Sequence, residues 1–147
     1  MKIYLASDHG GFKLKEKIEE HLRSKGLQVQ DLGPNKLDPT DDFPDFVIPL
    51  AKKVAEHKEN LGVALCRNGV GVEVAANKIN GVRAALSWDP RHAASSRHDD
   101  NSNVLALPAD YLDEKKAVEV LDAWLSTPYS KEARFERRIK KIEEEEK

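Results

Sequence analysis

The stretch LGVALCRNGVGVEVAANKI, residues 61–79, predicts a buried strand, a glycine turn and a helix in immediate succession. Its first six residues are apolar or small, which is typical of a strand buried on both faces. Gly69 and Gly71 then permit a tight turn, and the residues after them have a helical pattern. A strand that passes directly into a helix in this way is the repeating unit of a parallel sheet covered by helices.

The same alternation extends along the whole chain on both sides of this stretch. The patterns predict strands at 2–7, 27–33, 61–66, 82–88 and 103–108, and helices at 12–26, 45–58, 71–79, 89–100, 113–127 and 130–147. Pro49 must kink its helix or fall in the first turn, and the last residues of the terminal helix are expected to fray. The prediction is a single α/β domain over residues 1–147, a three-layer, doubly wound, Rossmann-like parallel sheet.

The composition limits the classes of partner and the compartment. The chain has 147 residues, with 24 basic and 26 acidic side chains and a formal net charge of −2. This balance argues against nucleic acid or an anionic membrane as the main partner, and no segment reaches the roughly 20 apolar residues of a membrane span. The start lacks a secretory pattern, and the single cysteine cannot form an intramolecular disulfide. We therefore expect a soluble cytoplasmic protein.

Three polar clusters follow predicted strands or lead into one. They are SDHGG at 7–11, CRNGVG at 66–71 and the region leading to HDDNSN at 98–103. Ligands in doubly wound sheets bind outside the carboxyl ends of the strands, near a switch in strand order. The sequence therefore predicts a site at which all three clusters meet.

The glycine turn and the thiol of Cys66 suggest a particular chemistry. The turn lets an oxyanion approach backbone N–H groups at a helix start, and such a place favours the thiolate form of a cysteine. A cysteine phosphatase needs an arginine where Val72 stands, a dinucleotide fingerprint needs glycine at Val74, and no P-loop pattern is present. Proton transfer by a thiolate beside an oxyanion hole remains, with an inert Cys66 in the core as the alternative.

Seven motifs in order connect the chain to a known family. They are SDHGGFKLK, DDFPDF, CRNGVGVEVAANK, GVRAAL, NVLAL, DAWLSTPY and RFERRIKKI. With these motifs the whole chain resembles the ribose-5-phosphate isomerase B family, which is related to the bacterial galactose-6-phosphate isomerase subunits. The resemblance implies an aldose–ketose isomerase of a phosphorylated sugar that needs no metal or cofactor. It also implies a homodimer, or a tetramer of paired dimers, with each active site at the dimer interface and the helix 130–147 reaching the partner subunit.

The resemblance also assigns roles to individual positions. Cys66 matches the base that moves a proton between C2 and C1 through a cis-enediolate, and Asp8 matches a residue that contacts sugar hydroxyls and assists ring opening. The substrate- and phosphate-binding positions are His9, Arg67, Asn68, Gly69, Val70, Gly71, Arg134 and Arg138. Two alternatives stay open from the residues alone: Asp8 can cap the next helix, and the paired arginines can form a solvated basic face.

Several positions depart from the usual pattern of the family. Asp99 stands where a ring-opening histidine is usual, and His98 lies one place earlier, about 100° away on a helix. In the glycine turn, Arg67 stands where the family usually has glycine, and Asn68 stands where it usually has a hydroxyl residue. Elsewhere, Phe43 stands in place of a tyrosine, Asp110 in place of an arginine and Phe135 in place of a histidine. Either Asp99, helped by Asp100, opens the ring, or the enzyme takes a sugar phosphate that is already open; the number of changed ring contacts favours the second.

Two other classes of protein compete with an isomerase as interpretations of the sequence. A non-catalytic sugar-phosphate-binding protein of the same fold is favoured by the missing histidine and opposed by the intact Asp8, Cys66 and glycine turn. A thiol redox protein is opposed by the absence of a second cysteine.

Overall fold

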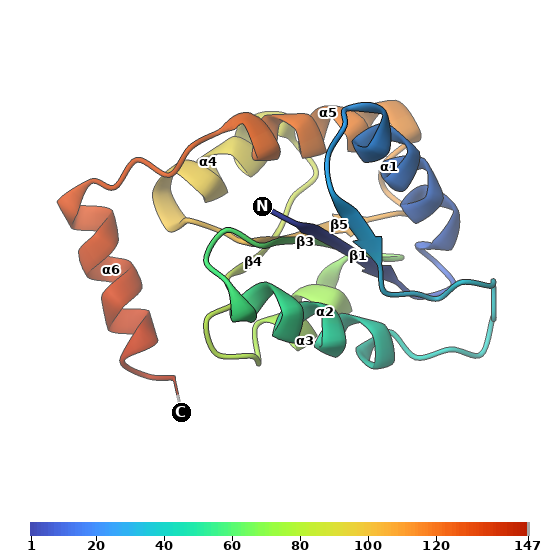
Figure 1. Cartoon of the computed structure of the whole chain (residues 1–147), viewed down its shortest axis with the longest axis horizontal. Coiled ribbons are helices and arrows are strands. Elements are labelled where there is room, and N and C mark those ends of the chain that lie inside the picture. Colours follow the sequence, from blue (N-terminus) through green and yellow to red (C-terminus); the bar gives the residue numbers. More distant parts are fainter. Residues whose placement is uncertain (147) are drawn as a thin grey trace.

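The computed structural model describes residues 1–146, which form one five-stranded sheet flanked by helices (Figure 1). The strands are β1 (Ile3–Ser7), β2 (Val29–Asp31), β3 (Leu61–Cys66), β4 (Ala84–Leu86) and β5 (Val104–Pro108). All pairings are parallel and the strand order is β2-β1-β3-β5-β4. The order reverses between β1 and β3, so the carboxyl ends of these two strands form the switch point at which doubly wound sheets bind ligands.

Helices cover both faces of the sheet, which confirms the predicted three-layer fold. They are α1 (Phe12–Ser24), α2 (Pro44–Glu56), α3 (Val70–Ala76), α4 (Pro90–Asp100), α5 (Glu114–Ser126) and α6 (Ala133–Glu143). In Figure 1, α1, α4 and α5 lie above the sheet and α2 and α3 below it. Two apolar clusters fill the two interfaces, one containing Leu121 and Trp124 of α5 and the other Val47 and Leu50 of α2. No helix in residues 1–146 is long and apolar enough to cross a membrane.

Local sequence signals explain where several helices begin and end. Asp89 caps α4 by accepting the N–H groups of Arg91 and His92 at 2.9 and 3.0 Å, and Pro90 occupies the first helical position as predicted. Asp113 caps α5 in the same way. These caps fix the two helices that precede and follow β5.

Two elements differ from the predicted bounds. Pro49 lies in the second turn of α2, because Pro44 already occupies the first helical position. The predicted helix 71–79 ends at Ala76, since the side chain of Asn77 turns to bond both the N–H and the C=O of Ala84, at 2.8 and 3.0 Å. Asn77 therefore has a structural role, joining the end of α3 to β4.

The C-terminal helix is shorter than the predicted 130–147. The helix α6 begins at Ala133 after an extended segment and ends at Glu143, and the expected fraying of the last residue, 147, lies outside the described residues. The helix stands apart from the sheet at the left of Figure 1. Phe135 is its one buried residue, and this ring meets the ring of His98 edge-on at 6.1 Å between centroids.

Candidate active site

Three connections meet at the carboxyl edge of the sheet, after β1, β2 and β3. Ser7 pairs with Leu65 in the sheet, and Cys66 pairs with Pro108 at the end of β5. The N–H of Asp8 bonds Leu65 O at 3.3 Å, and the N–H of Ser7 bonds Gly33 O at 3.1 Å. Two of the predicted clusters, 7–11 and 66–71, therefore lie side by side as expected.

Cys66 ends β3 with its side chain turned into the protein, where the residue is 4% exposed. Its Sγ lies 3.7 Å from Asn68 Oδ1, and the same oxygen accepts the N–H of Val70 at 3.0 Å. Because Oδ1 is held as an acceptor by the backbone, the thiol faces it as a donor. The first N–H groups of a helix have no partner within the helix, so with the N–H of Val70 taken by Asn68 the N–H of Gly71 is left for a ligand.

Both glycines of the turn are required by close contacts. Gly69 has a φ of +75°, and a Cβ there would lie 2.5 Å from Leu86 Cδ1. A Cβ on Gly71 would lie 2.6 Å from Cζ of Phe43, so the connection after β2 packs directly on the start of α3. The turn is thus held from both sides, by β4 and by the connection 32–43.

Asp8 and His9 extend from β1 beside this turn. Asp8 is 8% exposed, and its Oδ1 accepts the N–H of Gly11 at 3.1 Å in the turn before α1. The helix begins after Gly11 without a side-chain cap, so the capping role left open by the sequence is not observed. His9 bonds Asp41 twice, through its backbone N–H at 3.0 Å and its ring Nδ1 at 2.7 Å. The side chain of Asp41 is 6% exposed.

The side chain of Arg67 passes over Gly10, just before the start of α1. A Cβ on Gly10 would lie 2.4 Å from Arg67 Cγ, so the absence of a side chain at Gly10 gives the arginine its path. The guanidinium then lies 3.5 Å from Asp110 Oδ1, and both side chains are about half exposed. The structure therefore gathers Asp8, His9, Arg67 and the 66–71 turn at one edge.

The remaining predicted residues lie at the opposite edge, so the prediction that 98–103 joins the other two clusters is wrong. Helix α4 runs antiparallel to the strands and ends where β5 begins, beside the amino end of β3, where Gly62 N–H bonds Asn103 O at 2.9 Å. The length of β5, about 13 Å, separates this edge from Cys66. His98, Asp99, Arg134 and Arg138 are therefore not brought to Cys66 within one chain.

These residues form a second cluster where α4 meets α6. His98 Nδ1 lies 2.6 Å from Asp99 Oδ1, so the two side chains pair with each other. The guanidinium carbons of Arg134 and Arg138 lie 4.5 and 5.8 Å from the centre of the Phe135 ring, so both arginines are on one side of α6 as their spacing predicts.

Asp100 belongs to this cluster, although the sequence singled it out only as a helper of Asp99. Burial raises the pKa of Asp100, the Asp99 carboxylate raises it further, and the positive charge of Arg138 acts in the opposite direction.

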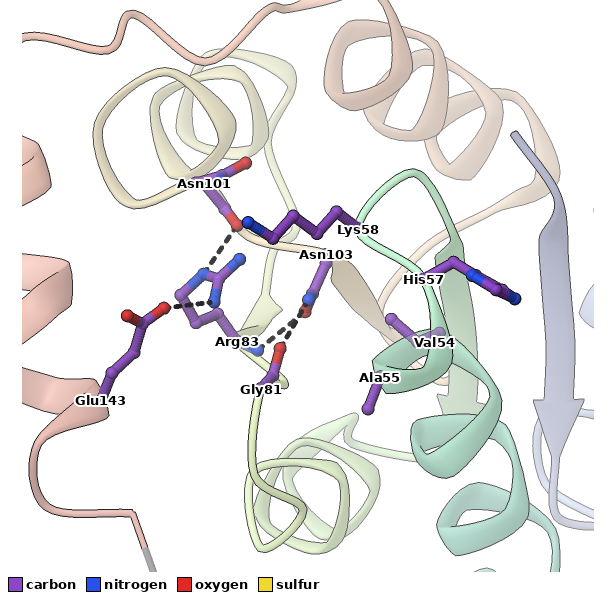
Figure 2. A pocket seen from close by; sticks show the side chains of 9 residues that line it. All are labelled: Val54, Ala55, His57, Lys58, Gly81, Arg83, Asn101, Asn103 and Glu143. Atoms are coloured by element: carbon purple, nitrogen blue, oxygen red, sulfur yellow. Dashed lines mark hydrogen bonds and ion pairs between the residues drawn. The ribbon is translucent and has the colours of Figure 1, made fainter.

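A cavity of about 310 Å³ also opens on this edge (Figure 2). Arg83 lies in it, donates Nε–H to Asn101 O at 2.9 Å and pairs with Glu143 of α6 at 3.8 Å. None of the predicted site residues lines this cavity, and its contacts fasten α6 to the body of the protein.

Asp41 is the functional candidate that the sequence did not single out. It lies in the stretch 34–44, which the sequence predicts to be a loop, and within the motif DDFPDF, to which no role was assigned. Its contact with His9 joins residues 32 positions apart, which no local pattern reports. Within residues 1–146, no group of three or more His, Cys, Asp or Glu side chains is placed to hold a metal ion.

Comparisons with known proteins give a uniform picture. The family model described as Ribose/Galactose Isomerase matches residues 3–142. Ribose-5-phosphate isomerase B of Mycobacterium tuberculosis is 37% identical over 139 residues, covering 95% of this chain and 86% of that protein.

Solved structures of the same kind superpose closely on the chain. The crystal structure of ribose-5-phosphate isomerase B from Mycoplasma genitalium with bound ribulose-5-phosphate has a TM-score of 0.94 and 42% identity, covering 97% of this chain and 94% of that one. A ribose 5-phosphate isomerase from Thermotoga maritima has a TM-score of 0.93 and 38% identity, covering 97% of both chains.

Proposed function

Because the chain belongs to the ribose/galactose isomerase family, we propose that it is an aldose–ketose isomerase that interconverts ribose 5-phosphate and ribulose 5-phosphate or a closely similar pair of sugar phosphates. The observation that carries the proposal is the position of Cys66, buried at the switch point of the sheet beside the glycine turn and Asp8. The lone cysteine and a sugar-phosphate substrate fit an enzyme of the cytoplasm.

Cys66 acts as the base in this proposal. Its thiolate takes the proton from C2 of the open-chain aldose, and the electrons pass through the C1–C2 bond to the carbonyl oxygen, giving a cis-enediolate. Transfer of the hydroxyl proton from O2 to O1 and return of the proton from Cys66 to C1 then give the ketose. The N–H of Gly71 and its neighbours in the 68–71 turn stabilise the negative oxygen, which is the largest single contribution in many enzymes that form such intermediates.

The other residues at this edge bind and orient the sugar. Asp8 contacts hydroxyl groups, and His9 and Arg67 lie where the chain of the sugar leads away from Cys66. The positive charge of Arg67 is available to an anionic group because its side chain is more than half exposed, with Asp110 as its neighbour at 3.5 Å.

The active site is completed by a second copy of the chain. Arg134 and Arg138 bind the phosphate across the interface of a homodimer, which can pair further into a tetramer. Two features support this arrangement. The helix α6 stands apart from the sheet of its own chain (Figure 1), and this helix, which carries both arginines, packs against α4 at the edge opposite the end of β3. In addition, α3 exposes the apolar side chains of Val70 and Val74 directly beside the glycine turn, as a surface covered by another subunit would.

A panel of four- to six-carbon aldose and ketose phosphates tests the proposal. Each sugar is incubated with the protein in deuterated water, and isomerisation and deuterium at C1 or C2 are followed by NMR. We expect turnover and deuterium incorporation with ribose 5-phosphate or a close relative. Saturable binding without turnover or exchange for every sugar would instead identify a non-catalytic sugar-phosphate-binding protein.

A further inference from the structure

Asp41 is a buried carboxylate in a connection that is otherwise mostly exposed. Its Oδ1 accepts two hydrogen bonds, both from His9, at 3.0 Å from the backbone N–H and 2.7 Å from ring Nδ1. Its Oδ2 is buried and has no hydrogen-bond partner in the part of the chain that the structure describes. Asp41 therefore has one visible partner, and that partner is a candidate substrate ligand.

The contact determines which nitrogen of His9 is free. An ionised carboxylate only accepts hydrogen bonds, so Nδ1 must carry the proton that it shares with Asp41. In the neutral ring, Nε2 then holds the lone pair. Nε2 makes no hydrogen bond to residues 1–146, and the His9 side chain is 25% exposed, so Nε2 is the atom that can meet a ligand.

We propose that Asp41 is a positioning residue for His9, fixing its Nδ1–H tautomer and its ring orientation so that Nε2 faces the bound sugar phosphate. The substrate part of this inference rests on the proposed function, whereas the tautomer does not. Asp41 acts through His9 and makes no contact of its own with the reacting atoms.

A purely structural role for Asp41 fits the contacts less well. The connection 32–43 is already fastened at its start, where the buried Lys15 bonds Pro34 O at 2.8 Å, and at its end, where Phe43 packs on Gly71. Burying a carboxylate with one oxygen unpartnered is costly, so it is a poor way to fasten a loop that has two other attachments. A role in orienting His9 explains why a charged carboxylate is buried at position 41.

The tautomer is tested directly by NMR. The nitrogen shifts of the histidine rings are recorded on uniformly ¹⁵N-labelled protein at a pH where His9 is neutral, and the spectrum of His9→Gln identifies its signals among the five histidines. We expect His9 of the wild type in the Nδ1–H form, and Asp41→Ala to release it into a mixture with the Nε2–H form. An Nε2–H ring in the wild type, or a spectrum that Asp41→Ala leaves unchanged, overturns the proposal.

The effect on the reaction is tested with a double-mutant cycle on the sugar phosphate that the wild type turns over best. Asp41→Ala is expected to lower kcat/KM about 10- to 100-fold, the usual effect of losing the placement of a substrate ligand. In a His9→Gln background, Asp41→Ala is expected to cause no further loss, because its effect passes through His9. Losses that multiply would mean that Asp41 acts independently of His9 and would overturn the proposal.

Two further variants separate positioning from damage to the loop. Asp41→Asn keeps the size of the side chain and an oxygen that can accept Nδ1–H, so it is expected to keep the tautomer and recover most of the lost kcat/KM. Asp42→Asn removes the same charge from the exposed neighbouring position in the same connection and is expected to leave kcat/KM and the His9 spectrum unchanged. A protein that turns over no sugar phosphate would contradict the proposed function, while the NMR result would still decide the tautomer.

Discussion

Cys66 faces a fixed hydrogen-bond acceptor in the free protein. Its sulfur donates to Asn68 Oδ1, and this oxygen cannot turn away without giving up the N–H of Val70. In its proposed role as a base, Cys66 must first give up its proton, so substrate binding would have to replace the contact with Asn68. The side chain of Asn68 is therefore part of the resting state of the site, a role that its place in the sequence did not indicate.

Replacing Cys66 with serine tests the base. Cys66→Ser should lower turnover by about 10² to 10⁴, the usual contribution of general acid–base catalysis, because a hydroxyl is a far weaker base than a thiolate. Serine keeps a donor for Asn68 Oδ1, so the thermal unfolding midpoint should change little. Steady-state turnover on the best sugar phosphate and a thermal melt measure the two effects, and near-normal turnover would remove Cys66 from the role.

Asp99, which stands where a histidine is usual in the family, is paired with His98 in the structure. The 2.6 Å contact between His98 Nδ1 and Asp99 Oδ1 keeps an imidazole in the cluster, although on the neighbouring position of α4. The Asp99 side chain is 42% exposed, and its Oδ1 is occupied by the contact with His98.

We expect Asp99→Asn to lower turnover on the best substrate by less than about tenfold, which is below the usual contribution of a general acid or base. His98→Asn is its matched variant. If His98→Asn lowers turnover only for sugars that can close a ring, ring opening is assigned to His98. If it lowers turnover slightly and equally for all sugars, a substrate that is already open is favoured. A hundredfold loss with Asp99→Asn in a folded protein would instead make Asp99 catalytic.

At the scale of elements, the sequence predicted every strand and helix, because apolar strands, glycine turns and helix caps are local signals. Asp89 and Pro90 marked the start of α4 for this reason. Contacts between different elements were missed: Asn77 ends α3 by bonding Ala84 of β4, and Phe43 of the connection after β2 packs on Gly71 of α3. Such contacts depend on the assembled fold, so no local pattern reports them.

The contact between α3 and the connection after β2 predicts an unusual response to Gly71→Ala. Alanine in a helix is favoured over glycine by about 1 kcal/mol. The new Cβ would lie 2.6 to 3.0 Å from three atoms of the Phe43 ring, and overpacking of this kind costs about 1–3 kcal/mol. We therefore expect no stabilisation, and a net loss of up to about 2 kcal/mol in the free energy of unfolding.

Chemical denaturation of a double variant separates the two effects. If the Phe43 ring is the obstacle, Gly71→Ala should be stabilising in a Phe43→Ala background, where only the helix preference remains. Val74→Ala, on an exposed position of the same helix, serves as the control for changes in α3 that meet no obstacle. Destabilisation by Gly71→Ala that persists without the Phe43 ring would show that another contact is responsible.

At the scale of the whole molecule, the site residues divide between two edges of one sheet. The sequence singled out these residues, but it placed residues 98–103 at the wrong edge of the sheet. Polar residues at the end of a helix have the same local pattern as polar residues at the end of a strand. The topology corrects this placement. In a parallel sheet each strand ends at the edge where the next helix begins, and each helix ends at the opposite edge of the sheet. Arg134 and Arg138 can therefore meet Cys66, as the proposed function requires, only if they come from another copy of the chain.

Mixed dimers test this division. Chains with Cys66→Ser and chains with Arg134→Ala and Arg138→Ala are each expected to be inactive. In a dimer of one chain of each kind, one site combines the intact Cys66 of the second chain with the intact arginines of the first, and the other site lacks both. Random pairing of equal amounts should then recover about a quarter of wild-type activity, since half of the dimers are mixed and each has one complete site. The dimers are formed by co-expression with two different affinity tags, and each variant expressed alone gives the background. If each site instead used arginines of its own chain, both sites of a mixed dimer would be defective, so purified mixed dimers without activity would contradict shared sites.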